Sequence, residues 1–250
     1  MIDFHTHFLP QIDDGAQKVS TSLDMLSESY KQGVRTVVAT PHCDINTEDD
    51  IDVFLQLRKK SYKILKDAME KDGREFPEIV LGCEYQISKP YRDFEKLHSL
   101  CIENTSYMLV EMPYSQWNEN HYDYLYDLTL NGIRPIVAHV ERFLNQKKKF
   151  HNLFSLDLLY QVNAGSFLSS STRRHIPDLF TCGAVQFIGS DMHNMDNRAQ
   201  NMKEVTERIL KSYGDSCLNN LLDNAEAALR NEHIQRRHYE QMPFFKKLRV

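Results

Sequence analysis

Short apolar runs, each followed by a longer segment of helical period, recur along the whole chain. They predict seven strands, at residues 2–4, 36–39, 79–81, 108–110, 135–138, 160–163 and 185–188. Strands that alternate with helices, with no linker between them, indicate parallel strands joined by helical crossovers. We therefore expect one α/β domain built as a closed or nearly closed parallel barrel, with an open doubly wound sheet as the alternative.

Two of the crossover segments show a clear helical pattern. Residues 22–32 and residues 49–71 both place apolar side chains at helical spacing among polar ones. The second of these helices is long and highly charged, and we expect its buried stripe to comprise Phe54, Leu57 and Leu65. Both helices are expected to connect neighbouring parallel strands.

The length and composition of the chain fit a single domain over residues 1–250. With 250 residues and 41% hydrophobic content, the chain can bury one substantial core. We expect the barrel to occupy residues 1–230. Residues 231–250, which are basic and aromatic from Arg236 onward, are expected to form a C-terminal extension.

Charge and cysteine usage narrow the class of partner and the compartment. The formal net charge of -5 gives no indication of a nucleic-acid or anionic-membrane partner. The N-terminus lacks the features of a signal peptide, and no window approaches the ~18 apolar residues of a spanning helix. The five cysteines, an odd number without a C-x-x-C spacing, indicate reduced thiols. We therefore expect a cytoplasmic protein that is not embedded in a membrane.

Residues that commonly bind metal ions follow six of the seven predicted strands. They are His5, His7, His42, Glu84, Glu111, His139, Asp191 and His193. Because the carboxyl ends of the strands in a parallel barrel meet on one face, these side chains are expected to lie together. Either Asp13 or Asp14, in the loop after the first strand, can reach the same pocket, and we favour Asp14.

The spacing inside two motifs supports a shared ion. His5 and His7 are two positions apart, so that both imidazoles project to the same side of an extended strand, and Asp191 and His193 repeat this arrangement. A single such residue is more often a helix cap or a surface group. The whole set together would be costly without cations, because close carboxylates repel one another and buried charge needs compensation. Mixed nitrogen and oxygen ligands suit Mn, Fe or Zn better than a structural thiolate zinc site.

Six short motifs carry these residues. They are the opening segment Met1-Ile2-Asp3-Phe4-His5-Thr6-His7, continuing to Asp13-Asp14-Gly15-Ala16, then Ala39-Thr40-Pro41-His42, Gly82-Cys83-Glu84-Tyr85, Glu111-Met112-Pro113, His139-Val140-Glu141-Arg142 and Gly189-Ser190-Asp191-Met192-His193-Asn194. In this order they resemble the PHP superfamily (polymerase and histidinol phosphatase). More narrowly, residues 1 to about 230 resemble the manganese-dependent protein-tyrosine phosphatases of bacterial capsule and exopolysaccharide loci.

The resemblance implies a distorted, TIM-like (β/α)7 barrel that holds three divalent metal ions, with manganese favoured over iron or zinc. It assigns the first ion to His5, His7, Glu84 and Asp191, the second to Asp14, His42 and His193, and the third to Glu84, Glu111 and His139. It also implies two arginines that grip phosphate, Arg142 and Arg198, and planar guanidinium groups suit that role.

The activity implied by the resemblance is hydrolysis of phosphomonoesters. In this hypothesis a hydroxide that bridges the ions attacks phosphorus, while the two arginines stabilise the transferring oxygens. The substrate would be the phosphotyrosines of a membrane-associated bacterial tyrosine kinase that regulates capsular or exopolysaccharide synthesis, and a homo-oligomer is a further expectation. No arginine stands six residues after any cysteine, which disfavours a cysteine-based phosphatase.

Several positions depart from the family pattern or invite a further role. Cys43 and Val140 replace the usual His and Pro, and Met192 replaces Ala, which we expect to narrow the mouth of the pocket. Cys43 and Cys83 are expected to pack as small residues that point away from the site. A shallow groove for a phosphotyrosine ring could be formed by Tyr85, Tyr91, Tyr114, Trp117 and Phe143, although packing on neighbouring helices is the more common role of such residues.

Three other functions remain as alternatives. The first is a phosphatase for a small metabolite, such as a histidinol-phosphatase. The second is a metal-dependent amidohydrolase, which also opens with H-x-H but usually has a bridging Lys where this chain has Glu84. The third is a binding module without catalysis, against which the nearly intact set of ligands argues.

Overall fold

A computed structural model of the chain describes residues 1–87, 91–114, 117–143, 152–170, 172, 176–181 and 183–235. The strands are β1 (Ile2–Thr6), β2 (Thr36–Ala39), β3 (His42–Asp44), β4 (Glu78–Leu81), β5 (Glu84–Gln86), β6 (Tyr107–Glu111), β7 (Arg134–Val137), β8 (Leu159–Asn163) and β9 (Phe187–Gly189). The helices are α1 (Val19–Lys31), α2 (Glu48–Asp72), α3 (Phe94–Leu97), α4 (Glu119–Leu130), α6 (Ile176–Thr181), α7 (Met202–Tyr213) and α8 (Asp215–Leu229). Three 3-10 turns complete the description, η1 (His98–Leu100), η2 (Val140–Phe143) and η3 (Ala164–Phe167).

All strand pairs are parallel, and they form two sheets with the orders β1-β2-β4 and β3-β5-β6-β7-β8-β9. The seven predicted strands are therefore confirmed. The two additional strands, β3 and β5, follow β2 and β4 after breaks of two residues, and the first break contains Pro41, which cannot donate to a strand ladder. β2 and β3 thus form one long strand with a two-residue interruption, and β4 and β5 form another.

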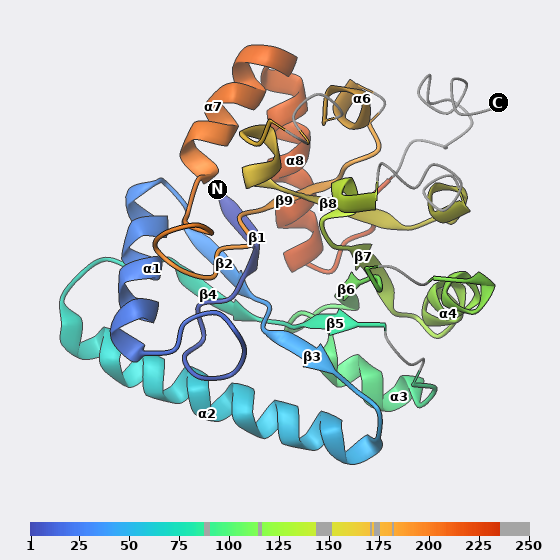
Figure 1. Cartoon of the computed structure of the whole chain (residues 1–250), viewed down its shortest axis with the longest axis horizontal. Coiled ribbons are helices and arrows are strands. Elements are labelled where there is room, and N and C mark those ends of the chain that lie inside the picture. Colours follow the sequence, from blue (N-terminus) through green and yellow to red (C-terminus); the bar gives the residue numbers. More distant parts are fainter. Residues whose placement is uncertain are drawn as a thin grey trace.

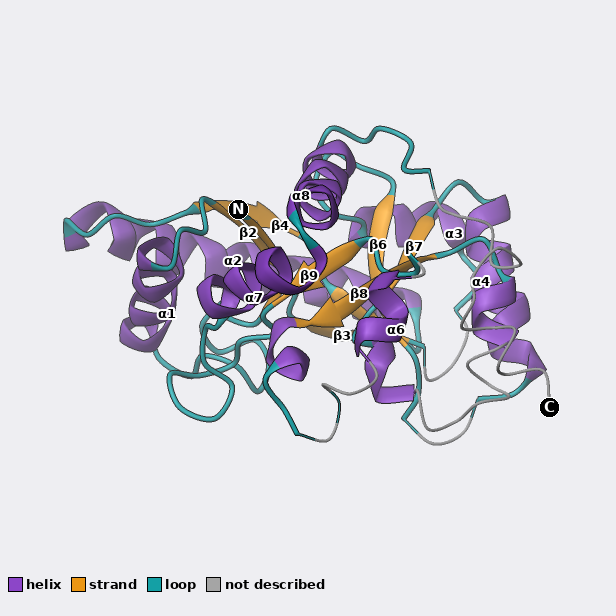
Figure 2. Ribbon diagram, turned by 90° about the horizontal axis from the view of Figure 1, so that it is seen from above, coloured by secondary structure: helices purple, strands orange, loops and turns teal. Residues whose placement is uncertain are grey.

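The two edges of this arrangement meet at β1 and the segment after β9. The backbone N–H of Asp191 donates to the carbonyl of His5 at 2.8 Å, and the N–H of His7 donates to the carbonyl of Met192 at 2.9 Å. A single parallel bridge joins Thr6 to Met192. The result, among the described residues, is a distorted (β/α) barrel that no continuous ladder closes between β1 and β9, in agreement with the predicted nearly closed parallel barrel, and its helices are arranged around the strands (Figures 1 and 2).

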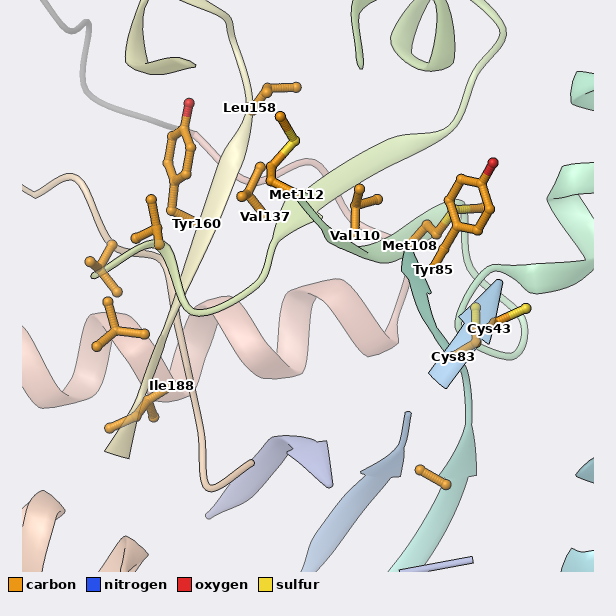
Figure 3. Packing of buried hydrophobic residues seen from close by; sticks show 14 of the residues in the cluster. Cys43, Cys83, Tyr85, Met108, Val110, Met112, Val137, Leu158, Tyr160 and Ile188 are labelled. Atoms are coloured by element: carbon orange, nitrogen blue, oxygen red, sulfur yellow. The ribbon is translucent and has the colours of Figure 1, made fainter. Parts of the chain in front are cut away.

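The central strands are buried on both faces. In β6, Met108 and Val110 belong to one hydrophobic cluster, while Leu109 between them belongs to a second cluster with Ala225 and Ala228 of α8. Figure 3 shows part of the first cluster, in which the side chains of Met108 and Val110 lie along the same strand. Burial on both faces is what a parallel sheet covered by helices requires, and it explains why these strands are continuous apolar runs.

The long helix α2 confirms the predicted crossover but not every residue of its predicted stripe. Phe54 and Leu65 are buried, whereas Leu57 is 46% exposed and Ser61 is buried instead. Leu57 precedes Leu65 by eight positions, which at roughly 100° per residue turns its side chain about 80° away from the buried face. The inclusion of Leu57 was therefore wrong, because apolar character does not by itself define the inner face.

Local signals explain where α2 begins and ends. Thr47 and Asp50 form a capping box at its start, which satisfies backbone N–H groups that the helix leaves free. Gly73 ends the helix with a φ of +75°, a left-handed conformation that glycine adopts without steric cost.

Within the described residues, no helix is long and apolar enough to cross a membrane. The predicted C-terminal extension lies outside the described residues from Arg236 onward.

Candidate metal centre

Glu84, the first residue of β5, lies at the middle of the candidate site. Its Oε2 atom is 3.1 Å from Nε2 of His5, 3.3 Å from Nε2 of His7 and 3.1 Å from Nδ1 of His42. Its Oε1 atom accepts a hydrogen bond from Nε2 of His139 at 2.8 Å. Four histidines from three strand positions, the ends of β1 and β7 and the start of β3, therefore meet one carboxylate that is only 1% exposed.

A second group of ligand-type atoms lies on the side of the loop after β1. Asp14 Oδ1 is 3.4 Å from Nε2 of His42 and 3.3 Å from Nε2 of His193. Together with His7, these side chains offer four ligand atoms that lie within 4.8 Å of one another. The favoured aspartate thus lies with the two histidines that the resemblance assigned to the same ion.

A third group lies on the side of β6 and β7. Glu111 Oε1 is 3.4 Å from Nε2 of His139, and one ligand atom each from His42, Glu84 and Glu111 lie within 4.8 Å of one another. Asp191 completes the cluster, because its Oδ1 atom is 3.5 Å from Nε2 of both His5 and His7. All nine predicted ligand residues therefore converge at the carboxyl ends of the strands.

Two ligand-type atoms of this cluster are buried without the hydrogen bonds that they would need if no metal ion were bound. Glu84 Oε2 and His193 Nε2 are buried, yet among the described residues they have no hydrogen-bond partner despite their close neighbours. Buried polar atoms without hydrogen bonds are costly, and buried carboxylates that face unpaired imidazole nitrogens are the usual surroundings of a bound cation.

The two aspartates of the Asp13-Asp14-Gly15 loop have different surroundings. Asp13 Oδ2 accepts hydrogen bonds from Nδ1 of His7 at 2.7 Å and from the backbone N–H of His42 at 3.1 Å. Burial opposes ionisation of Asp13, but the hydrogen bond and charge of His7 outweigh it and lower its pKa. Asp13 thereby holds the His7 ring with Nε2 facing the cluster, whereas Asp14 is exposed and reaches the cluster directly.

Gly15 allows this loop to fold back on β1. A Cβ atom at this position would overlap the carbonyl oxygen of His7, which accepts a hydrogen bond from Ala16 at 3.1 Å. Glycine is therefore required for the close approach that brings Asp13 and Asp14 to the site.

Two candidate ligands have strained backbones. The φ angle of His139 is +33° and that of Asp191 is +53°, in the region that residues with a side chain rarely adopt. Such conformations cost on the order of 1–3 kcal/mol and persist where surrounding contacts impose them. They occur here at two of the positions where the cluster needs a side chain turned inward.

Arg142 and Arg198 both contact Asp191. Nη2 of Arg142 donates to Oδ2 at 2.7 Å, and Nη2 of Arg198 lies 2.6 Å from Oδ1. About a third of each arginine side chain is exposed, at 32% and 37%. The two guanidinium groups therefore stand between the buried cluster and solvent, where an anion that approaches the cluster would meet them.

The charges of the cluster shift several pKa values. Burial opposes protonation of His5, but the charges of Glu84 and Asp191 outweigh it and raise the pKa of His5 to about 9. Burial likewise opposes protonation of His42, yet the hydrogen bond and charge of Glu84 raise its pKa to about 8. Burial and the charge of His7 lower the pKa of His193 to about 4. Without metal ions, His5 and His42 are therefore favoured in their protonated forms at neutral pH, and a metal ion must displace these protons to bind.

Strand β8 contributes two polar residues that are not among the predicted site residues. Gln161 Oε1 is 3.1 Å from Nδ1 of His5, and Asn163 Nδ2 donates to Oδ2 of Asp191 at 2.7 Å. These residues are two positions apart, the same spacing as in the predicted ligand pairs. Two amide residues at i and i+2 in the predicted strand 160–163 were the sequence feature from which their place in the site could have been predicted.

Met192 does not narrow the mouth of the site, because its side chain is fully buried in the first hydrophobic cluster. The groove proposed for a phosphotyrosine ring is also largely wrong. Tyr85, Trp117 and Phe143 are buried, and Trp117 packs edge-on against Phe143 with their ring centroids 4.6 Å apart. Of the five aromatics, only Tyr114 is largely exposed, at 75%.

The cysteines beside the ligand residues pack in the core, as expected. Cys43 and Cys83 are buried in the first hydrophobic cluster, and Figure 3 shows them next to Tyr85. Cys83 Sγ donates to the carbonyl of Leu100 at 3.3 Å. Burial raises the pKa of the Cys43 thiol, so this group is not a reactive thiolate.

A separate cavity of about 790 Å³ is lined by residues such as Tyr107, Arg134 and His233. Tyr107 and Arg134 begin β6 and β7, so this cavity lies at the opposite end of the strands from the candidate centre. Its position separates it from the ligand-type residues.

The fold and the cluster together define the class of α/β-barrel proteins in which histidines and carboxylates able to bind metal ions gather at the carboxyl ends of the strands. Within that class, the chain belongs to the CpsB/CapC family of capsular polysaccharide synthesis, whose family model matches residues 1–230.

Curated relatives match over nearly the whole chain. The tyrosine-protein phosphatase CpsB of Streptococcus agalactiae serotype V (strain ATCC BAA-611 / 2603 V/R) is 31% identical over 251 residues, which cover 94% of this chain and 100% of that protein. The tyrosine-protein phosphatase YwqE of Bacillus subtilis (strain 168) is 29% identical over 244 residues, which cover 94% of each chain. Both relatives are named tyrosine-protein phosphatases, which is the activity that the resemblance predicts for this chain.

A solved structure agrees with the fold. It comes from crystal structures of YwqE from Bacillus subtilis and CpsB from Streptococcus pneumoniae, described as unique metal-dependent tyrosine phosphatases. It superimposes with a TM-score of 0.82 at 26% identity and covers 95% of this chain and 97% of its own. The expected barrel of the capsule-locus phosphatases is thereby confirmed.

Proposed function

We propose that this protein is a metal-dependent phosphomonoesterase that removes phosphate from phosphotyrosine in proteins. The observation that carries the proposal is Glu84, a buried carboxylate surrounded by His5, His7, His42 and His139 at 2.8–3.3 Å. The names of its relatives support tyrosine phosphate as the substrate, since chains similar over their whole length are tyrosine-protein phosphatases.

The proposed centre holds three divalent ions. The first would be bound by His5, His7, Glu84 and Asp191, the second by Asp14, His42 and His193, and the third by Glu84, Glu111 and His139. The spacing of these side chains supports the first two sites, because ligand atoms of His5, His7 and Glu84, and of His7, Asp14, His42 and His193, lie within 4.8 Å of one another. For the third site, Nε2 of His139 lies 2.8 Å from Glu84 and 3.4 Å from Glu111. We favour manganese because the phosphatases that the sequence resembles are manganese-dependent, although a mixture of imidazoles and carboxylates also suits iron and zinc.

When bound, such ions activate water for attack on phosphorus and neutralise the charge of the phosphoryl oxygens. The remaining roles belong to the chain itself. Arg142 and Arg198, at the entrance to the cluster, would bind the phosphoryl oxygens through paired N–H groups. Asp13 keeps the His7 ring oriented, through the hydrogen bond to its Nδ1 at 2.7 Å. The two arginines would then exchange their contacts with Asp191 for contacts with the substrate phosphate.

The physiological partner that we propose is a membrane-associated tyrosine kinase of capsule or exopolysaccharide synthesis, whose phosphotyrosines would be the substrate. The family assignment supports this choice, because the family model is that of capsular polysaccharide synthesis. Phosphotyrosines of such a kinase suit a site with two partly exposed arginines at its entrance. We also propose that the protein acts in the cytoplasm and forms a homo-oligomer.

The test compares the purified protein after dialysis against a chelator with the same protein supplied with Mn, Fe, Zn or Mg. We expect hydrolysis of p-nitrophenyl phosphate to be lost on chelation and restored by Mn. Full activity in excess chelator, with no metal detected in the protein, would refute the metal-dependent mechanism. Phosphotyrosyl peptides should be preferred to phosphoseryl peptides and to histidinol phosphate, and a strong preference for histidinol phosphate would assign the protein to small-metabolite phosphatases instead.

A matched pair of variants tests the central carboxylate. Glu84→Gln should lower both the metal content and the turnover, because the amide cannot supply the charge that the ions require. Glu103→Gln is the control and should leave both unchanged, because Glu103 is exposed and precedes β6, whose far end carries Glu111.

A further inference from the structure

Strand β8 supplies none of the nine candidate ligands, yet two of its side chains enter the site. We propose that Gln161 and Asn163 are positioning residues that fix the tautomer of His5 and the orientation of Asp191. The inference rests on the metal centre proposed above and deepens it. The pair links ligands from three other strand positions through one continuous chain of hydrogen bonds.

The orientation of the Gln161 amide follows from a backbone group. The N–H of His139 can only donate, and it lies 2.9 Å from the atom of Gln161 that must therefore be the carbonyl oxygen, Oε1. The same Oε1 is 3.1 Å from Nδ1 of His5. Because an amide oxygen can only accept, Nδ1 of His5 must carry the proton. Nε2 of a neutral His5 is then unprotonated and faces Glu84 at 3.1 Å, as a metal ligand requires.

The same argument extends to Asn163 and Asp191. With its oxygen assigned, Gln161 presents Nε2, which donates to Oδ1 of Asn163 at 2.9 Å. The Asn163 amide is thereby oriented so that its Nδ2 donates to Oδ2 of Asp191 at 2.7 Å. The Oδ2 atom of Asp191 is thus engaged, and Oδ1 is the atom directed at Nε2 of His5 and of His7.

The pair also accounts for how two strained ligands are held. His139 and Asp191 have positive φ angles, and each receives or makes a hydrogen bond to one of the two amides. Gln161 is fully buried and Asn163 is 8% exposed, so water cannot replace these bonds. Buried, hydrogen-bonded amides that hold strained neighbours are a means of keeping a site organised before its ions bind.

Two variants of Gln161 separate its acceptor role from its contribution to packing. Gln161→Met keeps a side chain of similar length but removes both hydrogen bonds to the oxygen and the one to Asn163. We expect it to weaken Mn and Zn binding, measured by competition with a chromophoric chelator, by roughly 10–100-fold. Gln161→Glu retains an oxygen that accepts from His5 and His139, and we expect it to restore most of the affinity.

A spectroscopic readout reports the tautomer directly. In the 15N-labelled, Zn-loaded protein, the Nδ1–H resonance of His5 should be observed in the wild type and lost in Gln161→Met. Asn163→Leu should keep this resonance while it weakens metal binding, because it breaks only the connection to Asp191. The matched control is Gln186→Met, since Gln186 is equally buried but hydrogen-bonds the backbone of Tyr160 and Gly183 instead of a ligand.

The outcomes distinguish this inference from the proposed function. If the wild type binds no metal and Glu84→Gln changes nothing, the metal centre itself is wrong. If the wild type binds metal, but Gln161→Met binds it within twofold of the wild type and keeps the His5 resonance, the positioning role alone is refuted. Equal losses of affinity in Gln161→Met, Gln161→Glu and Gln186→Met would also refute it, because they would indicate a general effect of core mutation. Circular dichroism and the thermal midpoint of each variant identify any that fails to fold, in which case Gln161→Glu and Asn163→Leu decide.

Discussion

The guanidinium group of Arg142 donates from Nη2 to Oδ2 of Asp191 at 2.7 Å, across the boundary between the buried cluster and solvent. A cation that is a third exposed is thereby held against a carboxylate that is only 4% exposed. The contact orients the remaining N–H groups of Arg142 at the entrance, where the oxygens of a phosphoryl group would lie.

Replacement of Arg142 by Ala is expected to lower kcat/KM for p-nitrophenyl phosphate by about 100-fold to 1000-fold, the range for removing one preorganised donor from a transition state. Arg142→Lys should recover only part of this loss, because an ammonium group keeps the charge but not the paired N–H geometry. Metal content should stay near that of the wild type in both variants. Arg92→Ala serves as the control, since Arg92 pairs with Asp127 on the surface, and unchanged turnover in Arg142→Ala would remove Arg142 from the site.

The histidine pKa values predict how metal binding depends on pH. In the metal-free protein the pKa of His5 is raised to about 9 and that of His42 to about 8, from a usual value of 6.5. Their protonation therefore stabilises the metal-free fold fully below pH 6.5, and this contribution is lost as the pH rises through about 8 and about 9. Ions must displace these protons, so metal affinity should rise over the same interval.

The measurement is the difference between the thermal midpoints of the Mn-loaded and the chelator-treated protein at pH 6.5, 7.5 and 8.5. We expect this difference to grow with pH. Groups far from the centre titrate alike in both forms and cancel in the difference. A difference that shrinks with pH would show that His5 and His42 do not compete with the ions for protons.

The buried cysteines predict resistance to thiol reagents. Burial raises the pKa of Cys43, and it raises that of Cys101 to about 12, so neither is a thiolate at neutral pH. Treatment of the native protein with iodoacetamide should leave its phosphatase activity intact, and Cys83→Ala should keep the turnover of the wild type. Rapid inactivation that phosphate protects against would instead indicate a cysteine nucleophile.

The inner and outer faces of α2 predict unequal costs of truncation. Leu65→Ala removes a fully buried side chain and should lower the free energy of unfolding by about 2–5 kcal/mol. Leu57→Ala, on the same helix but 46% exposed, should change it by less than about 0.5 kcal/mol. Urea denaturation of the two variants under identical metal conditions measures the difference, and equal costs would contradict the assignment of faces.

The sequence alone was sufficient to predict the order of elements, the parallel barrel and the residues that gather at its carboxyl ends. Strand period, helix signals and ligand-type residues at strand ends are local properties, and the topology of a parallel barrel then places the ends of distant strands on one face. His5 and Asp191, which are 186 positions apart in the 250-residue chain, could therefore be predicted to meet. Their roles as ligands stay predictions that the metal measurements test.

Other features were decided only by the tertiary structure. Whether Leu57, Met192 or Tyr85 faces the core or the surface depends on how each element rotates against its neighbours, which a residue type does not specify. The division of labour between Asp13 and Asp14 depends on a loop that folds back over Gly15. The roles of Gln161 and Asn163 arise from hydrogen bonds between strands that are far apart in sequence, because an amide is an ordinary polar residue until its partners are fixed in space.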